Sequence, residues 1–230
     1  MKTIGLIGGM SWESTATYYR LINSQVKERL GGLHSAKILL WSFDFSEIAA
    51  LQAAGDWDGA TARMVDAGLS LKRAGAEALV ICTNTMHKMA QEVEAAAQLP
   101  LLHIADATAI AIKRENFHTI GLLATQFTME QEFYKGRLEQ KHGIRAVVPD
   151  ENGRDTVHRI IYEELCKGIV TEASKQHYLA VIDRLIGQGA QGIVLGCTEI
   201  GMLIQPEDVP IPVFDTTILH ATAVVDYMLG

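Results

Sequence analysis

The sequence predicts an α/β fold made of two similar parallel-sheet α/β domains related by a pseudo-two-fold axis. Two observations lead to this prediction. Buried strands alternate with amphipathic helices along the whole chain, and the first half of the chain recurs in the second half. Alternation of this kind is typical of parallel sheets with right-handed crossovers. Ligands of such sheets bind beyond the carboxyl ends of the strands, so we expect functional residues there.

Local patterns predict the elements of the first half one by one. The segment TIGLIGG has the apolar character of a buried strand, and the helix after it ends at the double glycine of residues 31–32. The later elements are a strand in AKILLWSFD (36–44), a helix over 59–74, a strand in ALVICT (78–83), a helix in MHKMAQEVEAAAQ (86–98) and a fourth strand in PLLHIAD (100–106).

The second half repeats this cycle. Its elements are a strand in TIGLLAT (119–125), a helix over 129–141, a strand in IRAVVP (144–149), two helices within 155–186, a strand in GIVLGCT (192–198) and a strand in IPVFDTT (211–217) before a last helix. We therefore expect an N-terminal domain of residues 1–105 plus 212–230 and a C-terminal domain of residues 106–211. The active site is expected in the cleft between them.

Direct sequence matches indicate that the two halves arose by duplication. The strand residues TIGL at 3–6 recur as TIGL at 119–122, and the same offset carries Tyr18 onto Tyr134 one helix later. The two matches occur in the same order at one spacing, which favours duplication over chance similarity between strand–helix units.

A second match identifies equivalent residues at two strand ends. The pair GA at 75–76 recurs at 189–190, and this offset aligns Thr83 with Cys197. Successive side chains of a strand point to opposite faces, so Cys82 cannot project in the same direction as Thr83. Free cysteine often behaves as a small buried hydrophobe, and we interpret Cys82 as a core residue behind the site.

Cys197 is the stronger candidate for a reactive thiol. It lies in GIVLGCTEI, where a buried strand meets a helix, and a helix N-terminus favours the thiolate and lowers the pKa of cysteine. The glycine before it and Thr198 and Glu199 after it resemble a tight turn that exposes a side chain. Cys166, within IIYEELCKG, is interpreted as a core residue.

Composition excludes several classes of protein. The chain has 230 residues, 48% of them hydrophobic, and a formal net charge of −7 without a run of Lys or Arg, so we expect neither disorder nor a nucleic-acid partner. The apolar start is interrupted by glycines, which argues against a signal peptide or a membrane span. Three cysteines at wide spacing predict no disulfide framework, and we expect a cytoplasmic protein.

Three motifs together resemble one enzyme family. The start IGLIGGM, the motif TNTMH and the motif GCTE are similar to the aspartate/glutamate racemase superfamily, nearest its aspartate racemase branch and its bacterial broad-specificity amino-acid racemases. The resemblance covers essentially the whole chain. It implies two α/β domains, no cofactor, a small-molecule amino-acid substrate and, at family level, a homodimer.

The resemblance also implies site residues. Members use two cysteines on opposite sides of the substrate α-carbon, and the second of these corresponds to Cys197. The first corresponds to Thr83, so this chain departs from the pattern at one of its two bases. A neutral hydroxyl is a far poorer base than a thiolate, and we expect Thr83 to donate or relay a proton. The two directions of the reaction should therefore be kinetically unequal.

The substrate carboxylate needs hydrogen-bond donors, because removing the α-proton adds negative charge beside it. In the family these donors follow the catalytic residues. The corresponding residues here are Asn84, Thr85 and Thr198, together with Thr125 and Thr128 on the duplicated first loop. Glu199 is expected as a further substrate-binding residue.

The residues expected to contact the substrate side chain differ from those of relatives that take aspartate. Residues 38–62 hold no Lys or Arg, although relatives that take aspartate are expected to carry an arginine after the second strand. Gln52 lies in the corresponding stretch and can bond a side chain without requiring a negative charge. Lys167 matches the family's lysine position, and Met10 is expected to line the pocket. Acidic and neutral amino acids both stay open as substrates.

Other kinds of site are not indicated. The eight histidines form no HExxH pattern, and GLIGGM lacks a full GxGxxG, so neither a metal nor a dinucleotide is expected. Two further functions stay open beside the racemase: a single-cysteine decarboxylase or hydantoin racemase of the same fold, and a non-catalytic amino-acid-binding protein.

Overall fold

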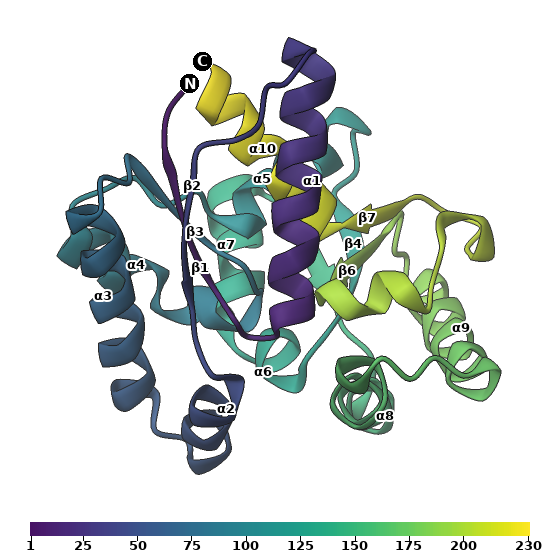
Figure 1. The fold of residues 1–230 in the computed structure, drawn as a ribbon. Coiled ribbons are helices and arrows are strands. Elements are labelled where there is room, and N and C mark those ends of the chain that lie inside the picture. The colour runs from purple at the N-terminus through teal and green to yellow at the C-terminus, as the bar shows by residue number, and fades with distance from the viewer. The chain divides into compact units, whose positions relative to one another are not determined.

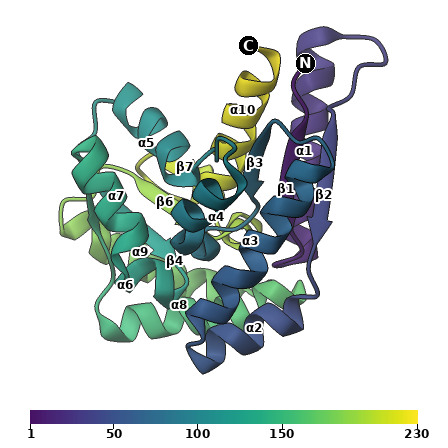
Figure 2. The ribbon, with the colours of Figure 1, turned by 90° about the vertical axis from the view of Figure 1, so that its left-hand side faces the viewer.

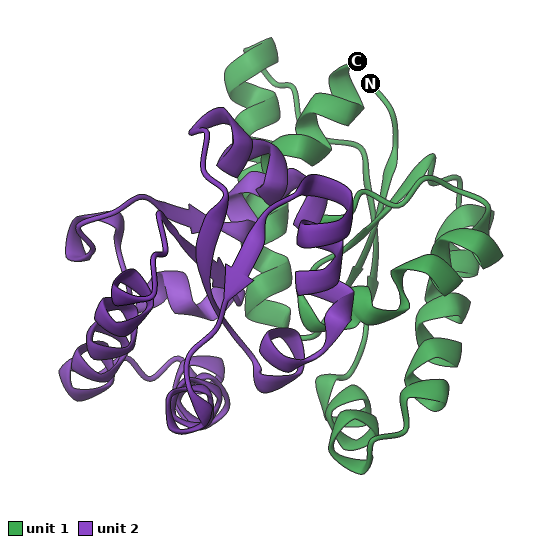
Figure 3. Ribbon diagram, turned by 180° about the vertical axis from the view of Figure 1, so that it is seen from behind, with its two compact units in different colours: residues 1–104, 220–230 green, residues 105–219 purple.

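The computed structural model describes residues 1–230 and divides into two compact α/β units (Figures 1 and 3). Unit 1 comprises Met1–Ile104 and His220–Gly230, and unit 2 comprises Ala105–Leu219. Every strand pair within each unit is parallel. The predicted α/β class with parallel sheets is confirmed.

Unit 1 has a three-stranded sheet in the order β2-β1-β3. Its elements are β1 (Ile4–Gly8), α1 (Trp12–Leu30), β2 (Ile38–Ser42), α2 (Phe45–Ala54), α3 (Trp57–Arg73), β3 (Ala78–Ile81), the 3₁₀ helix η1 (Thr85–Met89) and α4 (Ala90–Ala97), completed by the greater part of α10 (Thr216–Leu229).

Alternation along the strands of unit 1 builds two apolar layers. On one face Ile7, Leu79 and Ile81 pack with α3 and α4. On the other face Leu6 and Val80 pack with α1 and α10. In Figure 1, α3 and α4 lie on one side of these strands and α1 on the other, and Figure 2 views the sheet from the α3–α4 side. Burial on both faces explains why these strands are continuously apolar.

Unit 2 has a four-stranded sheet in the order β5-β4-β6-β7. Its elements are α5 (Ile104–Arg114, from Ala105), β4 (Thr119–Ala124), α6 (Gln126–Glu130), α7 (Glu132–His142), β5 (Arg145–Val147), α8 (Glu151–Glu163), η2 (Leu165–Lys167), α9 (Glu172–Gly187), β6 (Ile193–Gly196), η3 (Thr198–Met202), η4 (Pro206–Asp208) and β7 (Val213–Asp215).

The repeated glycine of the TIGL strands has the same packing role in both units. A Cβ atom on Gly5 would lie 3.1 Å from Leu71 Cβ, and one on Gly121 would lie 3.2 Å from Leu185 Cβ. Each glycine thus lets a helix, α3 or α9, approach the central strand closely. The two leucines are separated by the offset that aligns Thr83 with Cys197, so the packing supports the duplication.

In each half of the chain, the helix that follows the last strand or bridge belongs to the other unit. After β3, unit 1 has only a parallel bridge between Leu79 and Leu101, at the place that β7 occupies in unit 2. The helix that follows this bridge, α5, belongs to unit 2 from Ala105 onward, whereas α10, which follows β7, belongs to unit 1 from His220 onward. Each unit is completed by the helix that follows the other unit's sheet.

Each exchanged helix is bonded to the repeated tyrosine of its own unit. Tyr18 in α1 bonds its hydroxyl to His220 Nδ1 in α10 at 2.8 Å, and the Tyr134 hydroxyl in α7 donates to Thr108 Oγ1 in α5 at 3.4 Å. Both tyrosine side chains are fully buried. The sequence repeat of Tyr18 and Tyr134 therefore marks equivalent helix contacts.

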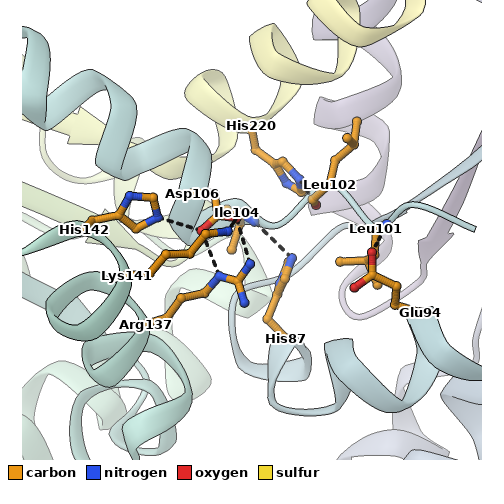
Figure 4. A network of polar contacts seen from close by, with 10 residues as sticks. All are labelled: His87, Glu94, Leu101, Leu102, Ile104, Asp106, Arg137, Lys141, His142 and His220. Atoms are coloured by element: carbon orange, nitrogen blue, oxygen red, sulfur yellow. Dashed lines mark hydrogen bonds and ion pairs between the residues drawn. The ribbon is translucent and has the colours of Figure 1, made fainter.

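An ionic cluster also holds α5 against α7 within unit 2 (Figure 4). The Asp106 carboxylate accepts two hydrogen bonds from Arg137, at 2.8 and 2.7 Å, and one each from Lys141 and His142 at 2.8 Å. Partial burial raises the pKa of Asp106, but the hydrogen bonds from Arg137, Lys141 and His142 and the positive charge of Arg137 outweigh it and hold this pKa well below its usual range.

Two sequence predictions are corrected by these elements. The expected fourth strand at 100–106 is a single bridge at Leu101, because α5 begins at Ile104 and leaves no length for a ladder. The expected return to the N-terminal domain at residue 212 is too early, because β7 pairs with β6 and the return comes at His220. No helix combines the length and apolar character needed to cross a membrane.

Candidate active site

In unit 2, the end of β6 presents Cys197 at a strand-to-helix junction. The strand ends at Gly196, where a Cβ atom would lie 2.9 Å from Ala124 Cβ of the neighbouring strand. Cys197 keeps an extended backbone, with φ −147° and ψ 134°, and the short 3₁₀ helix η3 starts at Thr198. The strand is therefore followed directly by a helix, as predicted, but the Cys197 side chain is half-buried and not exposed.

The side chain of Glu199 organises this turn. Its Oε2 accepts a hydrogen bond from Cys197 Sγ at 2.9 Å and another from Thr198 Oγ1 at 2.6 Å. The carboxyl group is buried, with 6% of the residue exposed. A buried carboxylate that already accepts from a thiol is a ready acceptor for the thiol proton.

The environment raises the pKa of Cys197 well above its usual value. Burial disfavours the thiolate, the negative charge of Glu199 adds to this effect, and Cys166 contributes as well. The expected lowering of the pKa by a helix N-terminus is wrong. The reason is that η3 has only five residues, so its dipole is weak, and a carboxylate lies beside the sulfur.

Three residues around Cys197 were not identified from the sequence as part of the site. Cys166 in η2 is half-buried and contributes to the raised pKa of Cys197. Burial and the neighbouring Cys197 raise the pKa of Tyr162 and of Tyr178, and the Tyr178 hydroxyl donates to the Val157 carbonyl at 3.2 Å. Both phenols are neutral, and both lie near enough to Cys197 for its charge to affect their pKa values.

In unit 1, Thr83 follows β3 at the place that Cys197 takes after β6. It precedes η1, a 3₁₀ helix of five residues like η3. Its carbonyl oxygen accepts a hydrogen bond from the His87 ring at 2.8 Å, four residues later. The side chain of Thr83 is partly exposed, whereas Asn84 and Thr85 are buried.

Cys82 is a core residue, as the sequence predicted. It is 1% exposed and belongs to the apolar layer between the unit 1 sheet and helices α1 and α10. Burial raises the pKa of its thiol far above the usual value. Its carbonyl accepts a hydrogen bond from Ser14 Oγ at 2.9 Å, which ties the strand end to α1.

The predicted side-chain pocket residues of unit 1 lie in one cluster. Gln52 in α2 is buried, and its Nε2 donates to Met86 Sδ at 3.2 Å. Met10 and Met86 are both members of the apolar cluster that also contains Ile48. The structure thus brings Gln52 close to Met86, next to a cluster of apolar side chains.

The remaining predicted residues lie in unit 2 at two places. Thr125 and Thr128 are buried at the start of α6, with their hydroxyl oxygens 3.3 Å apart. The first backbone N–H of α6, on Gln126, donates to His158 Nδ1 at 3.1 Å, a partner that the sequence did not reveal. Lys167 is exposed at the end of η2, directly after Cys166.

No group of three or more His, Cys, Asp or Glu side chains is placed to hold a metal ion. Most of the predicted residues gather where strands end. Unit 1 contributes Met10, Gln52, Thr83, Asn84 and Thr85, and unit 2 contributes Thr125, Thr128, Lys167, Cys197, Thr198 and Glu199.

Comparison with known proteins identifies the family of the chain. Residues 7–224 match the model of the Asp/Glu/Hydantoin racemase family. A crystal structure of a candidate Asp/Glu racemase from Yersinia pestis is 60% identical, with a TM-score of 0.94 and complete coverage of both chains. An aspartate racemase homologue from Pyrococcus horikoshii OT3 is 31% identical, with a TM-score of 0.86 and the same coverage.

A more distant relative is the broad specificity amino-acid racemase RacX of Bacillus subtilis (strain 168). It is 21% identical over 237 residues, which cover 99% of this chain and 98% of that protein. The family match spans both units, and the two structures align from end to end. The chain therefore belongs to the Asp/Glu/hydantoin racemase family and is an amino-acid racemase, an isomerase.

Proposed function

We propose that this protein interconverts the enantiomers of an α-amino acid without a cofactor, using one group from each unit. Cys197 removes or returns the α-proton on one side of the substrate, and Thr83 serves the opposite side. The observation that carries this proposal is the equivalent register of the two residues at the ends of repeated strands. Each is followed by a five-residue 3₁₀ helix, which begins directly after Cys197 and two residues after Thr83.

Glu199 prepares Cys197 for proton removal. In the first step the Cys197 S–H bond breaks and its proton passes to the Glu199 carboxylate, 2.9 Å away. The thiolate then takes the substrate α-proton, forming a new S–H bond and leaving a carbanion. The raised pKa of Cys197 makes this thiolate a strong base once it has formed.

The carbanion is stabilised through the substrate carboxylate. Asn84 and Thr85 at the start of η1, and Thr198 at the start of η3, supply polar side chains and backbone N–H groups at a strand end. Donors held in place before the reaction stabilise developing charge without a reorganisation cost.

Thr83 returns a proton on the opposite side. Its O–H bond breaks as the new C–H bond forms, and a water molecule gives a proton to the threonine oxygen in the same step. The hydroxide left by that water is neutralised by the proton that Glu199 received from Cys197 and releases to solvent. The reverse direction needs the same relay to act as a base. Proton transfer at Thr83 is therefore slower than at Cys197.

Side-chain recognition involves Gln52, Met10 and Lys167. The amide of Gln52 can donate to a carboxylate or to a neutral amide, and its surroundings in unit 1 are apolar. An aspartate- or glutamate-type substrate fits a Gln52 donor assisted by Lys167. Because RacX is a broad specificity amino-acid racemase, neutral amino acids are the second class of substrate to test.

The deciding experiment follows single enantiomers in deuterated water. Chiral analysis gives the inversion rate, and mass spectrometry gives the deuterium incorporation into recovered substrate. A carbon dioxide assay tests whether Cys197 instead supports decarboxylation. We expect inversion with deuterium incorporation and no carbon dioxide. Carbon dioxide release without inversion, or binding without exchange, would contradict the proposal.

A further inference from the structure

The His87 ring joins Thr83 to the segment that leaves unit 1. Its Nδ1 lies 2.8 Å from the Thr83 carbonyl oxygen. Its Nε2 accepts a hydrogen bond from the Ile104 N–H at 3.2 Å (Figure 4). A carbonyl oxygen can only accept, so Nδ1 carries the proton and Nε2 is the acceptor. The two bonds thus fix one neutral tautomer of the ring.

Packing leaves the His87 ring little freedom to turn. The residue is 2% exposed, and its ring centroid lies 4.6 Å from that of His103 and 5.6 Å from that of His220. His220 is itself fixed, because it bonds the Leu102 carbonyl at 2.7 Å and Tyr18 at 2.8 Å. Burial lowers the pKa of His220 to about 4, so this neighbour is neutral.

The backbone around Thr83 is held on both sides. The Cys82 N–H donates to the Ile7 carbonyl at 2.9 Å within the sheet, and the His87 N–H donates to the Asn84 carbonyl at 3.1 Å within η1. The Thr83 carbonyl lies between these two bonds and is bonded by the His87 ring. The orientation of this peptide unit sets the direction of the Thr83 side chain.

We propose that His87 is a positioning residue, which aims the Thr83 side chain by holding its carbonyl against the Leu102–Ile104 segment. The inference deepens the proposed function, since it concerns the residue that returns the proton. It assigns His87 no contact with the substrate. Its role is to keep the Thr83 hydroxyl in the one orientation that proton return requires.

Two substitutions separate the two bonds of the ring. In His87→Asn the side-chain amide falls near the position of Nδ1 and can keep the bond to the Thr83 carbonyl. In His87→Gln the amide falls near the position of Nε2 and can keep the bond to the Ile104 N–H. We expect His87→Asn to retain the ratio of inversion to deuterium exchange, and His87→Gln to lower it roughly fivefold, the factor expected for one lost hydrogen bond.

This ratio distinguishes positioning from general damage. Exchange with retention needs only Cys197, whereas inversion also needs Thr83. A matched control is His220→Gln, which disturbs the same histidine cluster without touching the Thr83 carbonyl and should lower both rates in equal proportion. If His87→Gln also lowers both rates equally, or if His87→Asn lowers the ratio as much as His87→Gln, the positioning role is wrong.

A second readout does not depend on turnover. The thiol introduced by Thr83→Cys is alkylated with iodoacetamide, and peptide mass spectrometry follows the reaction at position 83. Adding His87→Gln should raise this rate roughly fivefold because the peptide is released, and adding His87→Asn should not. Equal rates in all three proteins would overturn the inference, even if Thr83→Ala had already shown that inversion does not use Thr83.

Discussion

The ends of β3 and β6 are equivalent in the duplicated fold but differ in chemistry. After β6, Cys197 donates to a buried carboxylate, Glu199, which can receive its proton. After β3, Thr83 carries a neutral hydroxyl, and its backbone carbonyl accepts a hydrogen bond from His87. The end of β6 can therefore ionise the Cys197 side chain, whereas the end of β3 fixes the backbone of Thr83.

This difference has a kinetic consequence for the proposed reaction. The equilibrium between free enantiomers in water is fixed at equal amounts, so unequal ends cannot favour one product. They can only make kcat and KM differ between the two directions, in ratios that compensate. The duplicated fold therefore keeps two positions for proton transfer, and the residues at these positions can transfer protons at different rates.

The largest expected effect comes from replacing the thiol at the end of β6. Cys197→Ser should lower inversion and α-proton exchange by about 10³-fold, because a serine hydroxyl is a much weaker base than a thiolate. Both rates are measured by chiral analysis and deuterium incorporation. Cys82→Ala is the control, since its thiol lies in the core, and should keep most of the turnover. A Cys197→Ser enzyme with wild-type rates would refute the mechanism.

A smaller but more informative effect is expected at the β3 end. Thr83→Ala should lower inversion by on the order of 10- to 100-fold and leave exchange with retention largely intact, because Cys197 can still remove and return a proton on its own side. Thr83→Cys should bring the kcat values of the two directions closer together. If Thr83→Ala inverts both enantiomers as fast as wild type, Thr83 is only part of the pocket wall.

The Glu199 carboxylate should control the pH dependence of the β6 end. It raises the pKa of Cys197, so Glu199→Gln should lower that pKa and move the rising limb of kcat/KM to lower pH. Loss of the proton acceptor should also reduce the plateau rate roughly tenfold.

The pH profile is measured for both enantiomers, with thiolate absorbance as an independent titration. Glu172→Gln, at an exposed position in α9, is the matched control and should leave the profile unchanged. If the rising limb of the kcat/KM profile does not move in Glu199→Gln, the pKa of Cys197 does not determine that limb.

Substrate choice should depend on a residue of unit 1. Gln52→Leu keeps the volume but removes the donor, so kcat/KM for aspartate relative to alanine should fall about fivefold. Competition assays with the two amino acids in one mixture measure this ratio directly. An unchanged ratio would mean that Gln52 does not meet the substrate side chain.

The smallest effect compares the two exchanged helices. Tyr18→Phe removes a 2.8 Å hydrogen bond to His220, whereas Tyr134→Phe removes a 3.4 Å bond to Thr108. We expect a loss of about 1.5 kcal/mol in the free energy of unfolding for the first and about 0.5 kcal/mol for the second. Urea unfolding of both variants gives the difference, and equal losses would show that the longer bond is as strong as the shorter.

Much of the fold followed from patterns that are local or repeated. The TIGL match and the equivalence of Thr83 with Cys197 needed only the sequence, because close helix packing against Gly5 and Gly121 constrains the same residues twice. The single bridge at Leu101 was harder to predict. A short apolar run reads as a strand whether or not the neighbouring helix leaves room for a ladder.

The electrostatics of the site depended on details that a sequence does not specify. Glu199 was visible as part of GCTE, but whether its carboxylate faces the substrate or the Cys197 sulfur depends on a side-chain rotamer. The hydrogen bond between His87 and Thr83, in contrast, is indicated in the sequence by the spacing of the two residues. Residues four apart at a helix start lie one turn apart, so a ring that follows a strand end can reach back to its carbonyl.

The exchange of α5 and α10 also determines when each unit can be finished during synthesis on the ribosome. Unit 2 is one continuous segment, Ala105–Leu219, whereas unit 1 needs His220–Gly230 to cover the buried face of its sheet. Proteins with separate domains commonly fold the N-terminal one first as it emerges. Here the face of the N-terminal sheet that contains Leu6 and Val80 is covered by α1 alone until residues 220–230 have been made.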